Sequence, residues 1–120
     1  MSYWGYHLIL DVSGCDQTLM SNKENVYNWI TNLVKDIDMK PIGEPSIEYT
    51  AADDIDKAGF TAIQVIVTSS IVAHFIDATK QIYIDVFSCK KFDIDIVKRS
   101  IETYFKAGKM REFYLTRQAD

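Results

Sequence analysis

The stretch Gln81-Ile82-Tyr83-Ile84-Asp85-Val86-Phe87-Ser88-Cys89 decides the fold, because it is rich in β-branched and aromatic residues and apolar at even and odd positions alike. Residues 60–68 form a second run of the same kind. Apolar side chains on both faces are expected of central strands that are covered on both sides. Helices can cover one face of such a sheet, so we expect a second subunit to bury the other.

Outward from these two runs, the chain reads as strand, helix, strand, strand, strand, helix, strand. A turn over residues 13–16 is expected to close the first strand. The predicted strands are Tyr6–Val12, Ser46–Thr50, Phe60–Thr68, Gln81–Cys89 and Met110–Thr116.

Two segments have helical periodicity. Ser21 and Glu24 form a Ser-x-x-Glu capping box, which predicts the start of the first helix. The second helix is predicted to begin near Asp93 and to end at Gly108 as its C-terminal cap. The first helix should pack one apolar stripe against the sheet, formed by Val26, Trp29, Ile30, Leu33, Val34 and Ile37.

Composition narrows the class of protein. With 120 residues, 48% of them hydrophobic, the chain is expected to form one domain over residues 1–120. A net charge of -4 argues against a nucleic-acid partner, and the sequence has neither an apolar run of membrane-spanning length nor a signal peptide pattern, so we expect a cytoplasmic protein. Cys15 and Cys89 lie far apart, so neither a disulfide framework nor a metal site is indicated.

Three residues could carry chemistry: Ser69, His74 and Cys89, at offsets of five and twenty. Taken singly, each has a structural explanation as a turn serine, a core histidine or a small buried thiol. Their joint spacing is similar to a pattern of the prokaryotic S-adenosylmethionine decarboxylases, Glu-Ser-His-x-x-x-His followed by Asp-x-Phe-x-Cys. Gly5-Tyr6-His7-Leu8 and Gly59-Phe60-Thr61 also resemble segments of that family.

The resemblance implies a self-processing proenzyme that is cut between Thr68 and Ser69 into chains of residues 1–68 and 69–120. Ser69 would become a pyruvoyl cofactor, so that neither pyridoxal phosphate nor a metal is needed. His74 is the expected base, Thr61 would assist processing through its hydroxyl, and Cys89 is the expected acid. Because side chains alternate along a strand, we expect the chain to bend between residues 69 and 71 to bring Ser69 and His74 together.

The same resemblance implies an α+β fold, in which an antiparallel sheet carries helices on one face and pairs through the other into a four-layer αββα homodimer. The implied reaction is decarboxylation of S-adenosylmethionine to the aminopropyl donor for spermidine synthesis. Asp77 would replace the family's ribose-binding glutamate, one residue displaced, and Tyr3 or Trp4 would stack on adenine. This chain departs from the family's pattern on both sides of the cleaved serine, where it has Thr68 and Ser70.

Two other functions remain open. The cluster of Asp53, Asp54 and Asp56 could bind the distal cation of ornithine or arginine in a pyruvoyl-dependent decarboxylase of a smaller substrate, although a solvated acidic loop explains the same residues. A non-cleaving homologue that binds a ligand or a partner enzyme is the third possibility.

Overall fold

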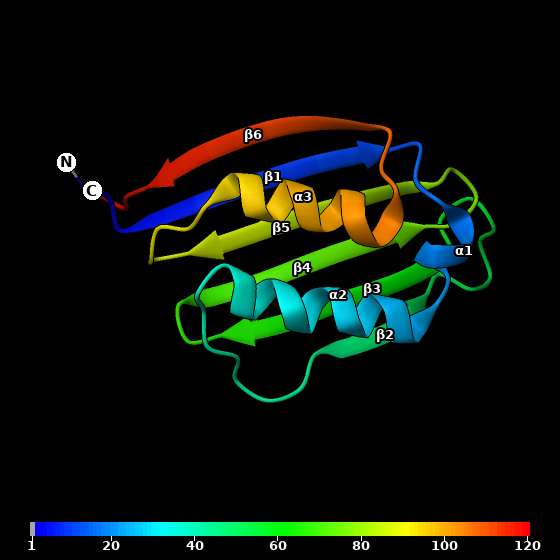
Figure 1. Cartoon of the computed structure of the whole chain (residues 1–120), viewed down its shortest axis with the longest axis horizontal. Coiled ribbons are helices and arrows are strands. Elements are labelled where there is room, and N and C mark those ends of the chain that lie inside the picture. Colours follow the sequence, from blue (N-terminus) through cyan, green and yellow to red (C-terminus); the bar gives the residue numbers. More distant parts are fainter. Residues whose placement is uncertain (1) are drawn as a thin grey trace.

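Six strands pair into one antiparallel sheet in the computed structural model, which describes residues 2–120 (Figure 1). The order across the sheet is β2-β3-β4-β5-β1-β6. The strands are β1 (Gly5–Ser13), β2 (Ser46–Thr50), β3 (Gly59–Ile66), β4 (Ser69–Ile76), β5 (Gln81–Ser88) and β6 (Lys109–Arg117); the helices are α1 (Gln17–Met20), α2 (Lys23–Asp36) and α3 (Ile94–Phe105).

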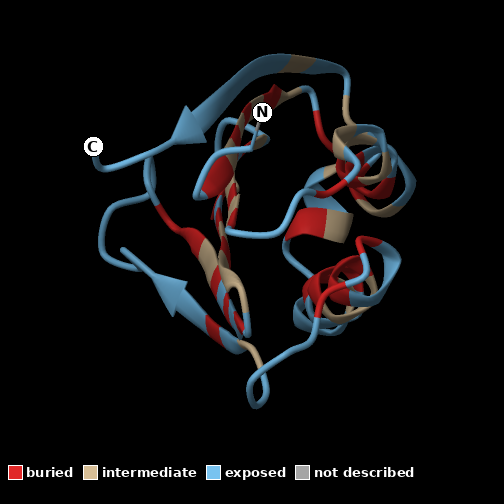
Figure 2. Cartoon of the chain, turned by 90° about the vertical axis from the view of Figure 1, so that its left-hand side faces the viewer, coloured by how far each residue is buried: buried red, intermediate tan, exposed pale blue. Residues whose placement is uncertain are grey.

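Helices α2 and α3 lie side by side on one face of this sheet (Figures 1 and 2). Three buried aromatic rings join the layers: Phe75 of β4 lies 6.1 Å from Trp29 of α2 and 5.2 Å from Phe105 of α3, centroid to centroid. The indole N–H of Trp29 donates to the Ser100 hydroxyl at 3.0 Å, so its one polar atom is satisfied inside the core. The predicted apolar stripe of α2 is confirmed, since all six of its residues are buried.

The opposite face of the sheet carries no helix (Figure 2). Large apolar side chains from β3, β5 and β6 are exposed on this open face, namely Ile63, Val65, Tyr83, Phe113 and Leu115. The predicted α+β class, with helices on one face of an antiparallel sheet, is therefore confirmed, and burial of the open face by a second subunit stays a prediction. Within residues 2–120, no helix is long and apolar enough to cross a membrane.

One strand was not predicted. Residues 60–68 were expected to form one strand, but β3 ends at Ile66 and β4 begins three residues later. Val67 and Thr68 form the whole turn of this hairpin. A turn of two residues without Gly, Asn or Asp carries none of the usual sequence signals. Strand β4 also begins with two polar residues, so the alternation of buried and exposed residues that follows them was overlooked.

The start of α2 also differs from the prediction. Asn22, rather than Ser21, is the N-cap, because its side chain accepts a hydrogen bond from the Asn25 N–H at 3.1 Å. Ser21 instead ends the short helix α1, which is capped by Asp16 inside the segment predicted as a turn.

The end of α3 differs in the same way. Lys106, with a φ of 51°, is the left-handed C-cap of the helix. Gly108 lies beyond it and donates its N–H to the Ser13 carbonyl at 2.9 Å, which joins the chain to the end of β1. A hydrogen bond between residues so far apart in sequence leaves no local signal. The sequence therefore predicts Gly108 as the cap, because glycine commonly follows the last turn of a helix.

Candidate active site

The hairpin between β3 and β4 holds the predicted cleavage site. Thr68 is the second residue of its turn, and Ser69 is the first residue of β4, paired with Ile66 across the hairpin and with Ser88 on the other side. Ser69 has a φ of 152°, which an L-residue other than glycine rarely adopts. The peptide bond predicted to break therefore precedes a strained residue, and strain of this kind costs about 1–3 kcal/mol.

Cys89 lies against this turn. Its backbone N–H donates a 3.0 Å hydrogen bond to the carbonyl oxygen of Thr68. That oxygen would take the negative charge if Ser69 attacked the carbonyl carbon, so the donor is placed where an oxyanion would form. The Cys89 side chain is exposed at the end of β5. Thr68, Ser69 and Cys89 are thus brought together.

His74 belongs to a second group of polar side chains. It pairs with Thr61 of β3 in the strand register, and its Nδ1 lies 3.4 Å from the Thr61 hydroxyl. That hydroxyl also lies 2.9 Å from the Thr50 hydroxyl of β2. The two predicted processing residues, Thr61 and His74, therefore contact each other.

The expected bend that would bring Ser69 to His74 is wrong. Strand β4 runs without interruption from residue 69 to residue 76. Every second residue, namely Ile71, Ala73 and Phe75, is buried on the face that the helices cover. His74 consequently lies on the open face. Five residues of strand separate it from Ser69 by about 16 Å. Within one chain, the histidine cannot reach the serine.

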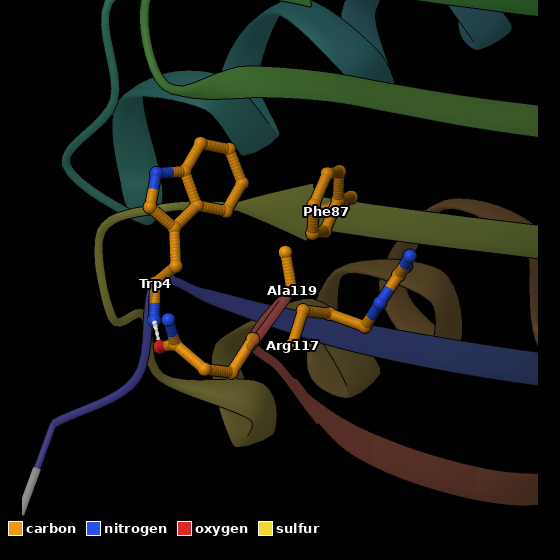
Figure 3. A pocket seen from close by; sticks show the side chains of 5 residues that line it. Trp4, Phe87, Arg117 and Ala119 are labelled. Atoms are coloured by element: carbon orange, nitrogen blue, oxygen red, sulfur yellow. Dashed lines mark hydrogen bonds between the residues drawn. The ribbon is translucent and has the colours of Figure 1, made fainter.

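Trp4 lines a pocket of about 400 Å³ at the end of the sheet where Ser69 lies, together with Phe87, Arg117, Gln118 and Ala119 (Figure 3). The Trp4 and Phe87 rings are 5.8 Å apart, and the guanidinium of Arg117 lies 5.1 Å from the Phe87 ring. Phe87 is the strand partner of Ser70 and precedes Cys89 by two residues. Tyr3, the alternative stacking residue, packs instead against Tyr6.

Asp77 lies at the other end of β4, just beyond His74 and away from the Trp4 pocket. Its Oδ2 accepts a 3.1 Å hydrogen bond from the hydroxyl of Tyr49, and this bond raises the pKa of the Tyr49 phenol. Its Oδ1 is buried and has no hydrogen-bond partner in the described part of the chain. One carboxylate oxygen thus remains available to a further donor, although Asp77 and Trp4 do not meet within one chain.

The acidic loop shows no built cation site. Asp53, Asp54 and Asp56 are all exposed, and Asp54 is engaged locally by accepting the backbone N–H of Asp56 at 3.1 Å. Among residues 2–120, no group of three or more His, Cys, Asp or Glu side chains is arranged to hold a metal ion.

Sequence reasoning missed two contributors to the site. The Cys89 backbone N–H could not have been found from the sequence. Every residue but proline has such a group, and only the fold directs this one toward the Thr68 carbonyl oxygen. Phe87 could have been found, since it is the aromatic residue of the Asp-x-Phe-x-Cys pattern, but the pattern alone did not predict a role for its ring.

Comparisons with known proteins found similar sequences and a similar fold. The family model for S-adenosylmethionine decarboxylase matches residues 6–118. S-adenosylmethionine decarboxylase proenzymes from Clostridium botulinum strains Langeland and Okra are each 31% identical over 107 residues, covering 88% of this chain and 84% of theirs. The crystal structure of the adenosylmethionine decarboxylase from Aquifex aeolicus VF5 superposes with a TM-score of 0.80 at 18% identity, covering 100% of this chain and 95% of that one.

The two thiols should differ in reactivity. Burial raises the pKa of the Cys15 thiol to about 11, so at pH 8 this group is both protonated and inaccessible, whereas Cys89 is exposed. A chromogenic disulfide reagent at pH 8 should therefore modify one thiol per native chain. Cys89→Ser should remove that reaction and Cys15→Ser should keep it; the reverse result would contradict the burial of Cys15.

Proposed function

Because the chain belongs to the S-adenosylmethionine decarboxylase family, we propose that it decarboxylates S-adenosylmethionine after cutting its own backbone between Thr68 and Ser69. The observation that carries the proposal is the hydrogen bond from the Cys89 N–H to the Thr68 carbonyl, next to a strained Ser69. The product would be the aminopropyl donor for spermidine synthesis.

Cleavage begins with Ser69. Its Oγ attacks the carbonyl carbon of Thr68, a C–O bond forms, the C–N bond breaks, and the hydroxyl proton passes to the released amine. An ester now joins the two residues. The Cys89 N–H stabilises the oxyanion of the tetrahedral intermediate. Opening the peptide bond also allows Ser69 to leave its strained φ, which favours the shift.

The second step needs a base. Removal of the Ser69 Cα proton expels the Thr68 carboxylate, and the dehydroalanine left at residue 69 takes up water and loses ammonia to become a pyruvoyl group. We assign the base to His74, with Thr61 orienting its ring through the contact at Nδ1. The products are chains of residues 1–68 and 69–120.

The pyruvoyl group, once formed, supplies the electron sink for loss of carbon dioxide. The chain's own residues bind substrate and move protons around it. Trp4 and Phe87 offer aromatic faces for the adenine beside Ser69, and the exposed Cys89 thiol is the proton donor at the same end of the sheet. Asp77 is the candidate partner for ribose hydroxyls through its carboxylate, whose buried Oδ1 has no hydrogen-bond partner among the described residues.

His74 can act on Ser69 if it comes from a second copy of the chain. The exposed apolar side chains of the open face suit a symmetric partner. When a two-fold axis runs between two such sheets, perpendicular to the strands, the Ser69 end of one meets the His74 end of the other. We therefore propose a four-layer αββα homodimer with two shared sites. The same pairing brings Asp77 of one chain toward Trp4 of the other.

Maturation tests the cleavage site. Incubated wild-type protein should give fragments 1–68 and 69–120 by intact mass, the second with a blocked amino terminus. Ser69→Ala should remain one chain, because it lacks the nucleophile. Ser70→Ala is the matched control and should still be cut. A cut in Ser69→Ala at the same bond would refute the assignment.

Mixed dimers test the shared site. Ser69→Ala and His74→Ala chains carry different tags, and neither should mature alone. Ser69→Ala should remain uncut, and His74→Ala should stop at the ester. When they are coexpressed, the intact Ser69 of one chain meets the intact His74 of the other, so the His74→Ala chain should mature. If that chain stays unprocessed in purified mixed dimers, His74 acts within its own chain or not at all.

Substrate choice is tested by release of labelled carbon dioxide from S-adenosylmethionine, ornithine and arginine side by side. We expect release from S-adenosylmethionine alone. Trp4→Ala should raise the apparent KM about 5- to 150-fold, because base stacking is worth roughly 1–3 kcal/mol, and should leave cleavage intact. Tyr3→Ala is the control and should have little effect.

Other outcomes favour the alternatives. Release only from ornithine or arginine, abolished when Asp53, Asp54 and Asp56 are changed to Asn, would favour a decarboxylase of a smaller basic substrate. No release from any substrate by fully cleaved protein would leave a binding module.

A further inference from the structure

The side chain of Thr68 is held by a chain of hydrogen bonds. The Lys90 N–H donates to the Ser88 hydroxyl at 3.0 Å, Ser88 donates to the Thr68 hydroxyl at 2.8 Å, and Thr68 donates to the sulfur of Met39 at 3.2 Å. Each hydroxyl has a single proton, and the backbone N–H can only donate. The Ser88 hydroxyl also lies 3.8 Å from the Met39 sulfur, farther than the Thr68 hydroxyl does, so the shortest contacts run from the Lys90 amide through Ser88 and Thr68 to the thioether.

Two members of this chain of bonds, Ser88 and Met39, are buried, and Thr68 is half-buried. Ser88 is fully buried, Met39 is 7% exposed, and Ser88 is the strand partner of Ser69. A buried hydroxyl that loses its partner costs more free energy than the same hydroxyl at the surface, because water cannot replace the bond. Ser88 therefore restrains the residue before the scissile bond more strongly than a surface contact would.

The segment that carries Met39 is itself fixed. The Lys90 ammonium lies 2.8 Å from a carboxylate oxygen of Asp38, and the Lys40 carbonyl accepts the N–H of Val67 at 2.9 Å. The sulfur thus belongs to a segment that follows α2 and is hydrogen-bonded to the turn of the hairpin.

From these contacts we infer that Ser88 is a positioning residue for self-cleavage, acting through Thr68. Two adjacent residues hold Thr68: Ser88 bonds the Thr68 side chain, and the Cys89 N–H bonds the Thr68 carbonyl oxygen. Together these bonds restrain the peptide plane that Ser69 must attack. The inference rests on the proposed function. The family's pattern has glutamate where this chain has Thr68, so the arrangement follows from this chain's own sequence.

The test measures the rate at which fragments 1–68 and 69–120 appear in freshly purified precursor. Ser88→Ala should slow cleavage about tenfold, the effect expected from losing one buried hydrogen bond that holds the reacting group. Ser88→Thr retains the hydroxyl and should restore most of the rate. The matched control is Ser100→Ala. Ser100 is a buried serine that is bonded to Trp29 and lies far from the turn, so its replacement should lower the melting temperature without slowing cleavage.

A double-mutant cycle shows whether Ser88 acts through Thr68. Thr68→Val should slow cleavage, and adding Ser88→Ala to it should slow cleavage little further, because the shared bond is already gone. Equal rates for wild type and Ser88→Ala, or a full additional loss in the Thr68→Val background, would overturn the inference while leaving the proposed function intact. A wild-type chain that is never cut would overturn both.

Discussion

The alternation of side chains along β4 is the constraint on which the site depends. Ser69 and His74 are five positions apart in β4, about 16 Å in a regular strand, and the strand stays regular because Ile71, Ala73 and Phe75 must all reach the helices. Burial of these three residues is worth several kcal/mol, more than a bend could recover. The core thereby separates the proposed nucleophile from its proposed base, and the proposed mechanism needs the open face.

The sequence predicted the elements that have a strong period and missed those that depend on distant contacts. The stripe of α2 was found because its apolar residues repeat at the helical spacing, and β5 was found because its run is rich in β-branched and aromatic residues. The two-residue turn at Val67 and the cap at Lys106 were not found, because neither contains a residue type that marks such a position. Long-range hydrogen bonds, rather than local preference, determine both.

The candidate site divides in the same way. The resemblance to the family's pattern pointed to Ser69, His74 and Cys89 and to the hydroxyl of Thr61. What spacing could not supply was distance, so a trio that reads as one group along the chain lies at two ends of the sheet. The departures from the family's pattern became interpretable only in three dimensions: Thr68 joins a buried hydrogen-bond chain, and Asp77 is shared with Tyr49.

The strand order has a consequence for the cut protein. A break after Thr68 assigns β1, β2 and β3 to one fragment and β4, β5 and β6 to the other, so the ladders β3–β4, β5–β1 and β1–β6 all join separate polypeptides. Strand β1 lies between two strands of the other fragment. After the proposed cut, the pieces would stay together without a covalent link, yet once unfolded they would have to find each other by diffusion. Maturation would then turn a first-order folding reaction into a second-order one, and the mature sheet would persist through its slow unfolding more than through its ability to refold.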